Sequence, residues 1–443
     1  MKNSLKGILL ASFIFSSVFT NAQEKKSLTL VEAIELSVKN SKQLKISVAK
    51  IDEAVAAVKE AMEKRLPDVS IAGSYLRIIT GTFNLKAQSS GSGGGGAGLP
   101  TVNDAVYGIL NTSIPIYNGG KTKYGIESSK FLAQATGMDA ENNKDEVIQN
   151  TIEAFANLFK AKSAVDLMKE NLSQSQERTK DFNNLEKNGL LPRNDLLKAE
   201  LQTSNVELNL LDAENNWQLA DINMALMLGL PATTEIVLDT TGIDKKNDDR
   251  TLEDYLQSAM KNRKDLTALD YRKKAAEAGV KMAQGEMYPS LKLTGGYIDA
   301  DIPKFLSITN AVNAGLGVSY NIGSLWKTKS KIQQAEARVK QMVLTESLMD
   351  DNIQLQVNKS YLTLISNRKK IEVYAKAVEQ AEENYRIIKN KFDNSLATAT
   401  DLLEADVSQF QARLSYTLAR ADAFVAYNKL LQTTGILSAG LKK

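Results

Sequence analysis

The sequence predicts a mainly α-helical protein with a β-barrel part, in which long coiled-coil helices form a tunnel and each chain contributes four transmembrane strands. Three observations predict this fold class. The chain contains two copies of one sequence unit. Each copy holds two segments of alternating apolar residues, and each holds a very long run of apolar residues at three-four spacing. Alternation with a period of two is typical of strands, whereas heptad spacing is typical of coiled-coil helices.

The repeat is visible as two alignments without gaps. Residues 29–67 align onto 251–289, and residues 121–230 align onto 327–436. A chain written twice predicts two structurally equivalent units, so the fold is interpreted one repeat at a time. The expected segments are a first repeat at 23–230, a linker at 231–250 around the waist of the molecule, a second repeat at 251–436 and a C-terminal tail at 437–443.

Residues 1–22 have the pattern of a secretory signal peptide. Lys2 and Lys6 precede an apolar stretch at 7–19, and small residues follow up to Ala22. This order of charged, apolar and small residues is typical of a cleaved signal. The alternative is an N-terminal membrane anchor, but a spanning helix needs about 20 apolar residues. We therefore expect an exported protein that is cleaved after Ala22.

The composition excludes several classes of function. The chain has no cysteine and no histidine, so it has no disulfide, no thiol nucleophile and no imidazole base or metal ligand. Its formal net charge is only +3, and no basic patch is clustered as nucleic-acid binding requires. We expect no enzyme activity, no cofactor, no metal and no nucleic-acid partner.

Each repeat is expected to open with two helices. A capping pattern comes first, with Thr29 three residues before Glu32 and Thr251 three residues before Asp254. A second helix of about 23 residues then ends at a proline, which lacks the N–H that a helix needs. These second helices are expected at about 44–66, before Pro67, and at about 266–288, before Pro289.

Strands are expected next because apolar residues alternate with small or polar ones. Val69, Ile71 and Tyr75 share one face in the first repeat, and Val312 and Leu316 do so in the second. Strands of about nine to eleven residues cross a bilayer when tilted. A surface hairpin on a soluble domain is the alternative, and export together with an apolar face favours membrane strands. The expected strand pairs are 68–79 with 105–117, and 290–299 with 311–322. A Gly-rich stretch at 89–98 joins the first pair. It is expected to be a tolerated loop, and the alternative is a loop that binds a molecule outside the cell.

A helical hairpin completes each repeat, at 121–229 and at 327–434. In the second repeat, Val357 and Leu364 belong to an apolar seam that continues for five heptads, and Phe155 and Phe182 belong to the same seam in the first. In the second repeat, no Pro or Gly interrupts the long helix from about 329 to 393 before a tight turn. The two shorter helices of each repeat together match the long one, so they are expected to stack end to end along it.

Four strands per chain imply an assembly. Closing a barrel takes about eight strands, and open sheet edges are not tolerated in lipid. Three copies would give a closed barrel of about twelve strands. We therefore expect a homotrimer, embedded in outer-membrane lipid, that acts as a conduit.

Three segments are the most specific marks of a known family. One is 114–120, which leaves the second strand and ends in two glycines, and the others are the hairpin turns 189–200 and 395–406. The family pattern at these turns is a Gly followed six residues later by Asp, then hydrophobic residues and a small residue. With the direct repeat, these segments resemble the TolC-type outer-membrane efflux and secretion channels over essentially the whole mature chain.

The resemblance implies a fold, a location and partners. Such a protein would be a trimer in the outer membrane of a Gram-negative bacterium, with its helical tunnel in the periplasm. It would export small molecules or proteins as the outer component of a tripartite efflux or type I secretion system. Its partners would be a periplasmic adaptor protein and an inner-membrane transporter, either proton-driven or ATP-driven.

The resemblance also places two groups of site residues near the turns. The turns themselves would be the periplasmic tip, where an adaptor docks; Ser395 replaces the family's Gly there. The residues expected to dock are Gly189, Leu190, Leu191, Ser395 and Leu396, and the acids expected to ring the aperture are Asp195, Asp401 and Glu404.

The acids near the turns have two possible roles. Asp401 and Glu404 are three residues apart and share a helix face, so threefold repetition would make acid rings that attract cations. Alternatively, Asp401 is an acid at a helix N-terminus that stabilises the helix dipole. In the family, polar links between neighbouring inner and outer helices hold the closed aperture near this turn. Here Ala397 lies two residues after Ser395 and Phe392 three residues before it, so a lock based on a guanidinium group is not evident at these positions.

Two other functions remain as alternatives. A periplasmic adaptor also has a signal peptide and a long helical hairpin, but it would carry one hairpin and a lipoyl-like module rather than a complete repeat. A carboxylate-based hydrolase would need converging acids, whereas the acids here are spread along helix surfaces.

Overall fold

The computed structural model describes residues 25–77, 79, 104–239, 250–303 and 306–440. The predictions for the signal peptide, for the Gly-rich loop and for the end of the linker lie outside these residues. The chain divides into two compact units. A helical unit comprises Met1–Ser47, Ala140–Lys264 and Asp350–Lys443, and a sheet unit comprises Val48–Asp139 and Asp265–Met349.

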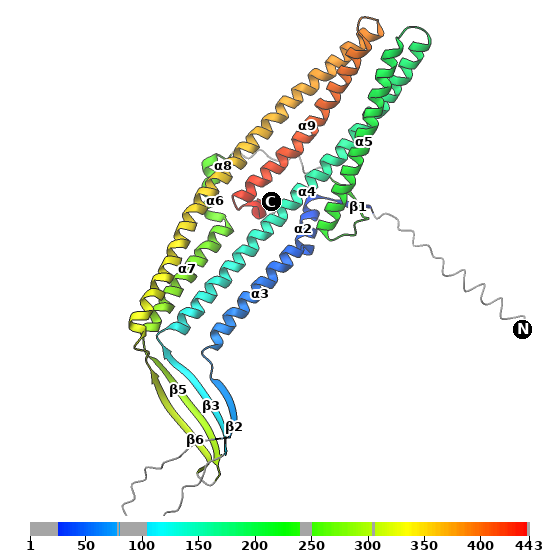
Figure 1. The fold of residues 1–443 in the computed structure, drawn as a ribbon. Coiled ribbons are helices and arrows are strands. Elements are labelled where there is room, and N and C mark those ends of the chain that lie inside the picture. The colour runs from blue at the N-terminus through cyan, green and yellow to red at the C-terminus, as the bar shows by residue number, and fades with distance from the viewer. Residues whose placement is uncertain (1–24, 78, 80–103, 240–249, 304–305, 441–443) are drawn as a thin grey trace, which may run out of the picture. The chain divides into compact units, whose positions relative to one another are not determined.

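The sheet unit contains four antiparallel strands that lie side by side in the order β2-β3-β5-β6 (Figure 1). The strand pair of the first repeat is therefore joined to the strand pair of the second through β3 and β5, while β2 and β6 form the edges of the sheet. The strands are β2 (Asp68–Arg77), β3 (Asp104–Asn118), β5 (Ser290–Ile302) and β6 (Leu306–Ser319). All four overlap the ranges expected from alternation.

One face of this sheet is apolar and exposed. Ile71 pairs with Leu110 and Leu293 pairs with Leu316, so apolar side chains meet across strands on the same face. Ile71 is 81% exposed and Val312 is 79% exposed. A soluble sheet would bury such a face against a core. In the single chain this face has no such cover.

The alternation is weakest in β3, and the structure gives the reason. The register between β3 and β5 shifts between Pro115 and Tyr117, which marks a β-bulge. Proline has no N–H to give to the ladder and is found in sheets mainly at edges or bulges. Just beyond, Gly119 has a φ of +69°, and a Cβ there would lie 2.1 Å from the carbonyl oxygen of Gly285. Only glycine fits this close approach.

Each repeat contains the same series of helices: two opening helices, one long helix and one returning helix. The long helices are α4 (Lys121–Lys187) and α8 (Ser324–Asp393), and the returning helices are α5 (Arg193–Leu228) and α9 (Ala399–Thr433). The opening helices are α2 (Leu30–Asn40), α3 (Lys42–Glu63), α6 (Leu252–Asn262) and α7 (Lys264–Gln284), with a 3-10 turn η1 (Gly285–Met287). Among the described helices, none has the length and apolar character needed to cross a bilayer.

Both predicted capping boxes form. The Thr29 backbone N–H donates to Glu32 Oε2 at 2.9 Å, and the Glu32 N–H donates back to Thr29 Oγ1 at 3.3 Å. Thr251 and Asp254 make the same exchange. The Asp side chain is shorter than Glu but still reaches, so α2 and α6 begin alike.

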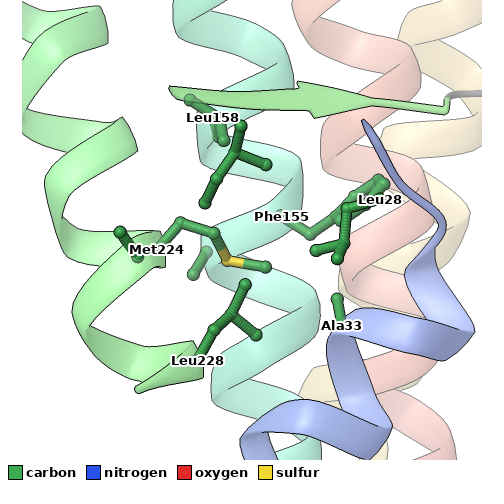
Figure 2. Packing of buried hydrophobic residues seen from close by; sticks show 9 residues of the cluster. Leu28, Ala33, Phe155, Leu158, Met224 and Leu228 are labelled. Carbon is green, nitrogen blue, oxygen red and sulfur yellow. The ribbon is translucent and has the colours of Figure 1, made fainter. Parts of the chain in front are cut away.

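The helical unit has a core beside the short strands β1 (Lys25–Leu28) and β4 (Glu235–Leu238), which pair in parallel. Figure 2 shows Leu28 and Ala33 directed toward Phe155 on α4, with Met224 and Leu228 of α5 closing the cluster. The segment 231–250 therefore contributes a strand to this core.

Buried polar groups tie β4 to α5. Asp221 Oδ1 accepts the Ile236 N–H at 3.0 Å, and burial raises the pKa of Asp221. The C-terminal segment also packs, because α10 (Leu437–Gly440) begins with a fully buried Leu437. The tail expected from residue 437 thus starts as part of the fold.

The buried seam predicted along the long helices contains polar as well as apolar residues. Phe155 and Phe182 are buried on α4, as the heptad pattern predicts, and Val357 and Leu364 are buried on α8. Between Val165 and Phe182, however, the buried positions of α4 are polar: Asn171, Ser175 and Arg178. This polar stretch leads into the turns at the ends of the hairpins.

Candidate channel tip

The two hairpin turns have the same backbone. Leu190 N–H donates to the Leu185 carbonyl at 2.8 Å, and Leu396 N–H donates to the Lys391 carbonyl at 2.7 Å. Gly189 has a φ of +69° and Ser395 a φ of +59°, so both residues are left-handed. This is the glycine-favouring end of a helix, and the second repeat builds it with a serine.

A shared apolar cluster lies beneath both turns. Phe182 of the first hairpin stacks on Phe392 of the second, with ring centroids 5.3 Å apart. Leu191, Leu196 and Leu402 are buried in the same cluster. Phe392, at one of the positions where the family would place its lock, thus packs as an aromatic ring in this cluster. Through the cluster, each hairpin supports the other.

The burial separates the residues expected to dock. Leu190 is 73% exposed and Leu396 is 77% exposed, so their side chains are available to a partner. Leu191 is only 9% exposed because it belongs to the tip cluster. Its side chain therefore supports the turn and does not belong to the docking surface we propose below.

The first candidate acid, Asp195, is engaged within the tip. Lys198 Nζ lies 3.1 Å from Asp195 Oδ1 and also donates to Thr400 Oγ1 at 3.1 Å. Lys198 thereby links the first hairpin to the start of α9 in the second. Lys198 is not among the predicted site residues, and its only signal in the sequence is the three-residue spacing from Asp195.

The other two acids differ from each other. Asp401 Oδ2 accepts the Thr398 N–H at 2.9 Å and the Thr398 hydroxyl at 2.7 Å, completing a capping box for α9. The backbone N–H of Thr398 lowers the pKa of Asp401. Glu404 is exposed, and within the described residues its carboxylate has no ion-pair partner. Asp401 therefore has the structural role of an acid at a helix N-terminus, whereas Glu404 is exposed and has no such role.

A buried ion pair joins the hairpins further from the turns. Arg178 Nη1 on α4 lies 2.8 Å from Asp406 Oδ2 on α9, and their side chains are 7% and 5% exposed. Arg413 adds a second link, to Glu382 at 2.8 Å and to Glu170 at 3.3 Å. Neither arginine is among the predicted site residues. A charge inside the heptad seam at Arg178 was the available signal.

A sheet with an exposed apolar face and paired helical hairpins defines a class: the subunit of a helix-and-strand channel of the outer membrane. Comparison with known proteins agrees. The outer membrane efflux protein BepC of Brucella suis biovar 1 (strain 1330) is 20% identical over 442 residues, covering 98% of this chain and 91% of that protein.

Solved structures share the fold over most of their length. The outer-membrane channel CmeC of Campylobacter jejuni has a TM-score of 0.76 at 17% identity, covering 93% of this chain and 88% of that one. The outer-membrane protein VceC of Vibrio cholerae has a TM-score of 0.74 at 20% identity, covering 92% and 96%. These likenesses establish the fold.

The model of the outer membrane efflux protein family matches residues 33–230 and 255–436, and the chain belongs to that family. The protein is therefore an outer-membrane efflux channel component and not an enzyme. The match runs through both repeats, which leaves the periplasmic-adaptor alternative without support. Among the described residues, no cluster of acidic side chains could hold a metal ion.

Proposed function

We propose that three copies of this chain form a channel that exports small molecules or proteins through the outer membrane, as the outer component of a tripartite efflux or secretion system. The observation that carries the proposal is the four-stranded sheet with an exposed apolar face and two outer edges, β2 and β6. Such edges must be paired in lipid, and three sheets joined edge to edge would close a barrel.

The helical unit supports the same assembly. Exposed apolar residues follow α5 at Leu201, Leu208, Leu211 and Leu219, and follow α8 at Leu355, Leu362, Ile365 and Val373. Both rows have successive spacings of seven, three and eight residues. Heptad-like rows left exposed on a single chain are typical of helices that pack against other helices. We propose that neighbouring copies cover them.

The tip would then dock the rest of the system. Leu190 and Leu396 project as exposed apolar side chains from two turns of the same backbone geometry, a surface that would fit the hairpin of a periplasmic adaptor. Glu404, repeated by threefold symmetry, would place a ring of acid near the aperture that attracts cations. Asp195 and Asp401 would add to this field while holding their structural hydrogen bonds.

The proposal is tested by mild crosslinking of a tagged copy in its native host, followed by mass spectrometry of the captured proteins. An adaptor with a proton-driven transporter would indicate small-molecule efflux, and an adaptor with an ATP-driven exporter would indicate secretion of proteins or peptides. Capture should fall when Leu190 and Leu396 are both changed to Ser, while the SDS-resistant oligomer persists. Capture of no adaptor, where a control channel captures its own, would contradict tip docking.

A further inference from the structure

The two long helices carry lysines and no acids near their N-termini, whereas five of the shorter helices, α2, α5, α6, α7 and α9, have an acid in the first turn. Lys121 and Lys123 lie at the start of α4, Lys327 and Lys329 at the start of α8, and neither first turn holds an acidic residue. A helix N-terminus carries partial positive charge and favours anions. Placing lysines there is locally unfavourable, and such a violation is expected where a negative ligand binds.

A buried hydroxyl at the same place lacks a partner. Ser324 is the first residue of α8 and is 7% exposed, and among the described residues its Oγ has no hydrogen-bond partner. The backbone N–H of Ser324 is already satisfied by the Asn321 carbonyl at 2.9 Å, so the turn itself leaves the hydroxyl unused. A buried polar group without a partner is costly, which points to a ligand oxygen.

The surroundings of Ser324 are apolar and exposed. Ile322 is 63% exposed and Trp326 is 65% exposed, and Leu325 and Tyr320 are also exposed. They directly follow β6, whose exposed apolar face we assign to the membrane. Tryptophan and tyrosine are enriched where a membrane meets water, because one end of each ring is apolar and the other polar. This segment therefore lies where lipid headgroups begin.

The charges that face this segment leave two lysines available. Lys331 is neutralised by Glu286 at 2.6 Å on the neighbouring turn. Lys327 and Lys329 are exposed, and in the described part of the chain neither has an ion-pair partner. On α7, Lys281 lies 5.6 Å from the ring centroid of Tyr124 and adds further positive charge to the sheet unit.

We propose that the start of α8 binds the phosphate of an anionic glycerophospholipid in the periplasmic leaflet of the outer membrane. The Ser324 hydroxyl donates to a phosphate oxygen, Lys327 and Lys329 supply the opposing charge, and Ile322 and Trp326 contact the acyl chains. The inference rests on the outer-membrane channel proposed above and names one lipid class that this channel selects.

The test is native mass spectrometry of the detergent-purified oligomer titrated with phosphatidylglycerol or with phosphatidylcholine. The protein should prefer phosphatidylglycerol, and changing Lys327 and Lys329 together to Gln should weaken that binding by about thirtyfold, from about 1 kcal/mol per lysine at an anionic surface. Lys340→Gln is the matched control, because Lys340 is an exposed lysine further along the same helix. It should bind as the parent does.

Ser324→Ala gives a second readout. Removing an unpartnered buried hydroxyl should leave the lipid-free oligomer as heat-stable as the parent or more so, while its preference for phosphatidylglycerol falls. Equal binding of both lipids, or unchanged binding by the Lys327 and Lys329 double variant, would overturn the proposal. Competition by millimolar inorganic phosphate would instead assign the site to free phosphate. A soluble monomer would contradict the channel itself, so the two failures are distinguishable.

Discussion

The two hairpin turns have the same backbone but different means of support. The first has Gly189 in the left-handed position, and α5 begins at Pro192 without a side-chain cap. The second places Ser395 in that position and begins α9 with the Thr398–Asp401 capping box. A left-handed conformation costs an L-residue about 1–2 kcal/mol, and a cap contributes about 1 kcal/mol. The second turn therefore carries strain that its cap largely offsets.

The interactions around the turns are unequal as well. The buried pair Arg178–Asp406 crosses from the first hairpin to the second, whereas the equivalent positions in the repeat hold Asn384 and Glu200. The repeat thus preserves backbone geometry and not the polar contacts. The two halves are thus equivalent in backbone geometry and differ in the polar contacts that they make near the turns.

The largest effect is expected from breaking the Arg178–Asp406 ion pair, which has no equivalent at the matching positions of the repeat. Asp406→Ala leaves the Arg178 guanidinium buried without a partner and should destabilise the protein by about 3–5 kcal/mol. A fall in the temperature at which the proposed SDS-resistant oligomer dissociates would report this loss. The double change of Arg178 to Met and Asp406 to Leu should be far milder. A double variant as unstable as the single one would show that the charge imbalance is not the cause.

Next come two leucines near the first turn that differ in burial. Leu196 is fully buried in the tip cluster, so Leu196→Ala should cost about 2–5 kcal/mol through lost contacts and a cavity. Leu190→Ala should change stability by less than about 0.5 kcal/mol, since the side chain is exposed. Thermal unfolding in detergent compares the two. Equal losses would place Leu190 in the core and contradict its assignment to docking.

The turn residues themselves should respond in opposite directions. Gly189→Ala should destabilise by about 1–2 kcal/mol, because alanine is strained at positive φ, and Ser395→Gly should stabilise by up to about 1 kcal/mol. The same thermal measurement applies to both. If Ser395→Gly were as harmful as Gly189→Ala, the serine side chain would have a role that its backbone does not reveal.

The smallest effect concerns the cap of α9 and its dependence on pH. Thr398→Ala should cost about 1 kcal/mol by removing the capping hydroxyl. The folded-state pKa of Asp401 is lowered, so its contribution is present above the unfolded pKa of about 3.9 and is lost as the pH falls through the lower folded value. Asp401→Asn should therefore flatten the acid side of the stability profile. An unchanged profile would assign the acid sensitivity to another carboxyl.

Much of this fold could be predicted because its signals are local and repeated. Alternation located all four strands, and Pro67 and Pro289 limited the helices that precede them. The order β2-β3-β5-β6 could not be read in this way, because the pairing of β3 with β5 joins residues far apart in sequence. The capping role of Asp401 was predictable from Thr398 three residues earlier.

The contacts between hairpins were not predictable. Arg178 and Asp406 are separated by 228 positions, and no local pattern indicates which acid an arginine on a helix face will meet. Leu190 and Leu191 are chemically alike, and only the packing of the turn decides which is exposed. The orphan hydroxyl of Ser324 likewise depends on tertiary burial.

The most direct test of the central claim is the mass of the detergent-solubilised protein, taken from outer-membrane fractions and measured by native mass spectrometry. We predict an assembly of three mature chains that survives SDS until heated, as edge-to-edge closure of three sheets requires. A monomer or a dimer, purified under conditions that preserve a known trimeric channel, would contradict the account.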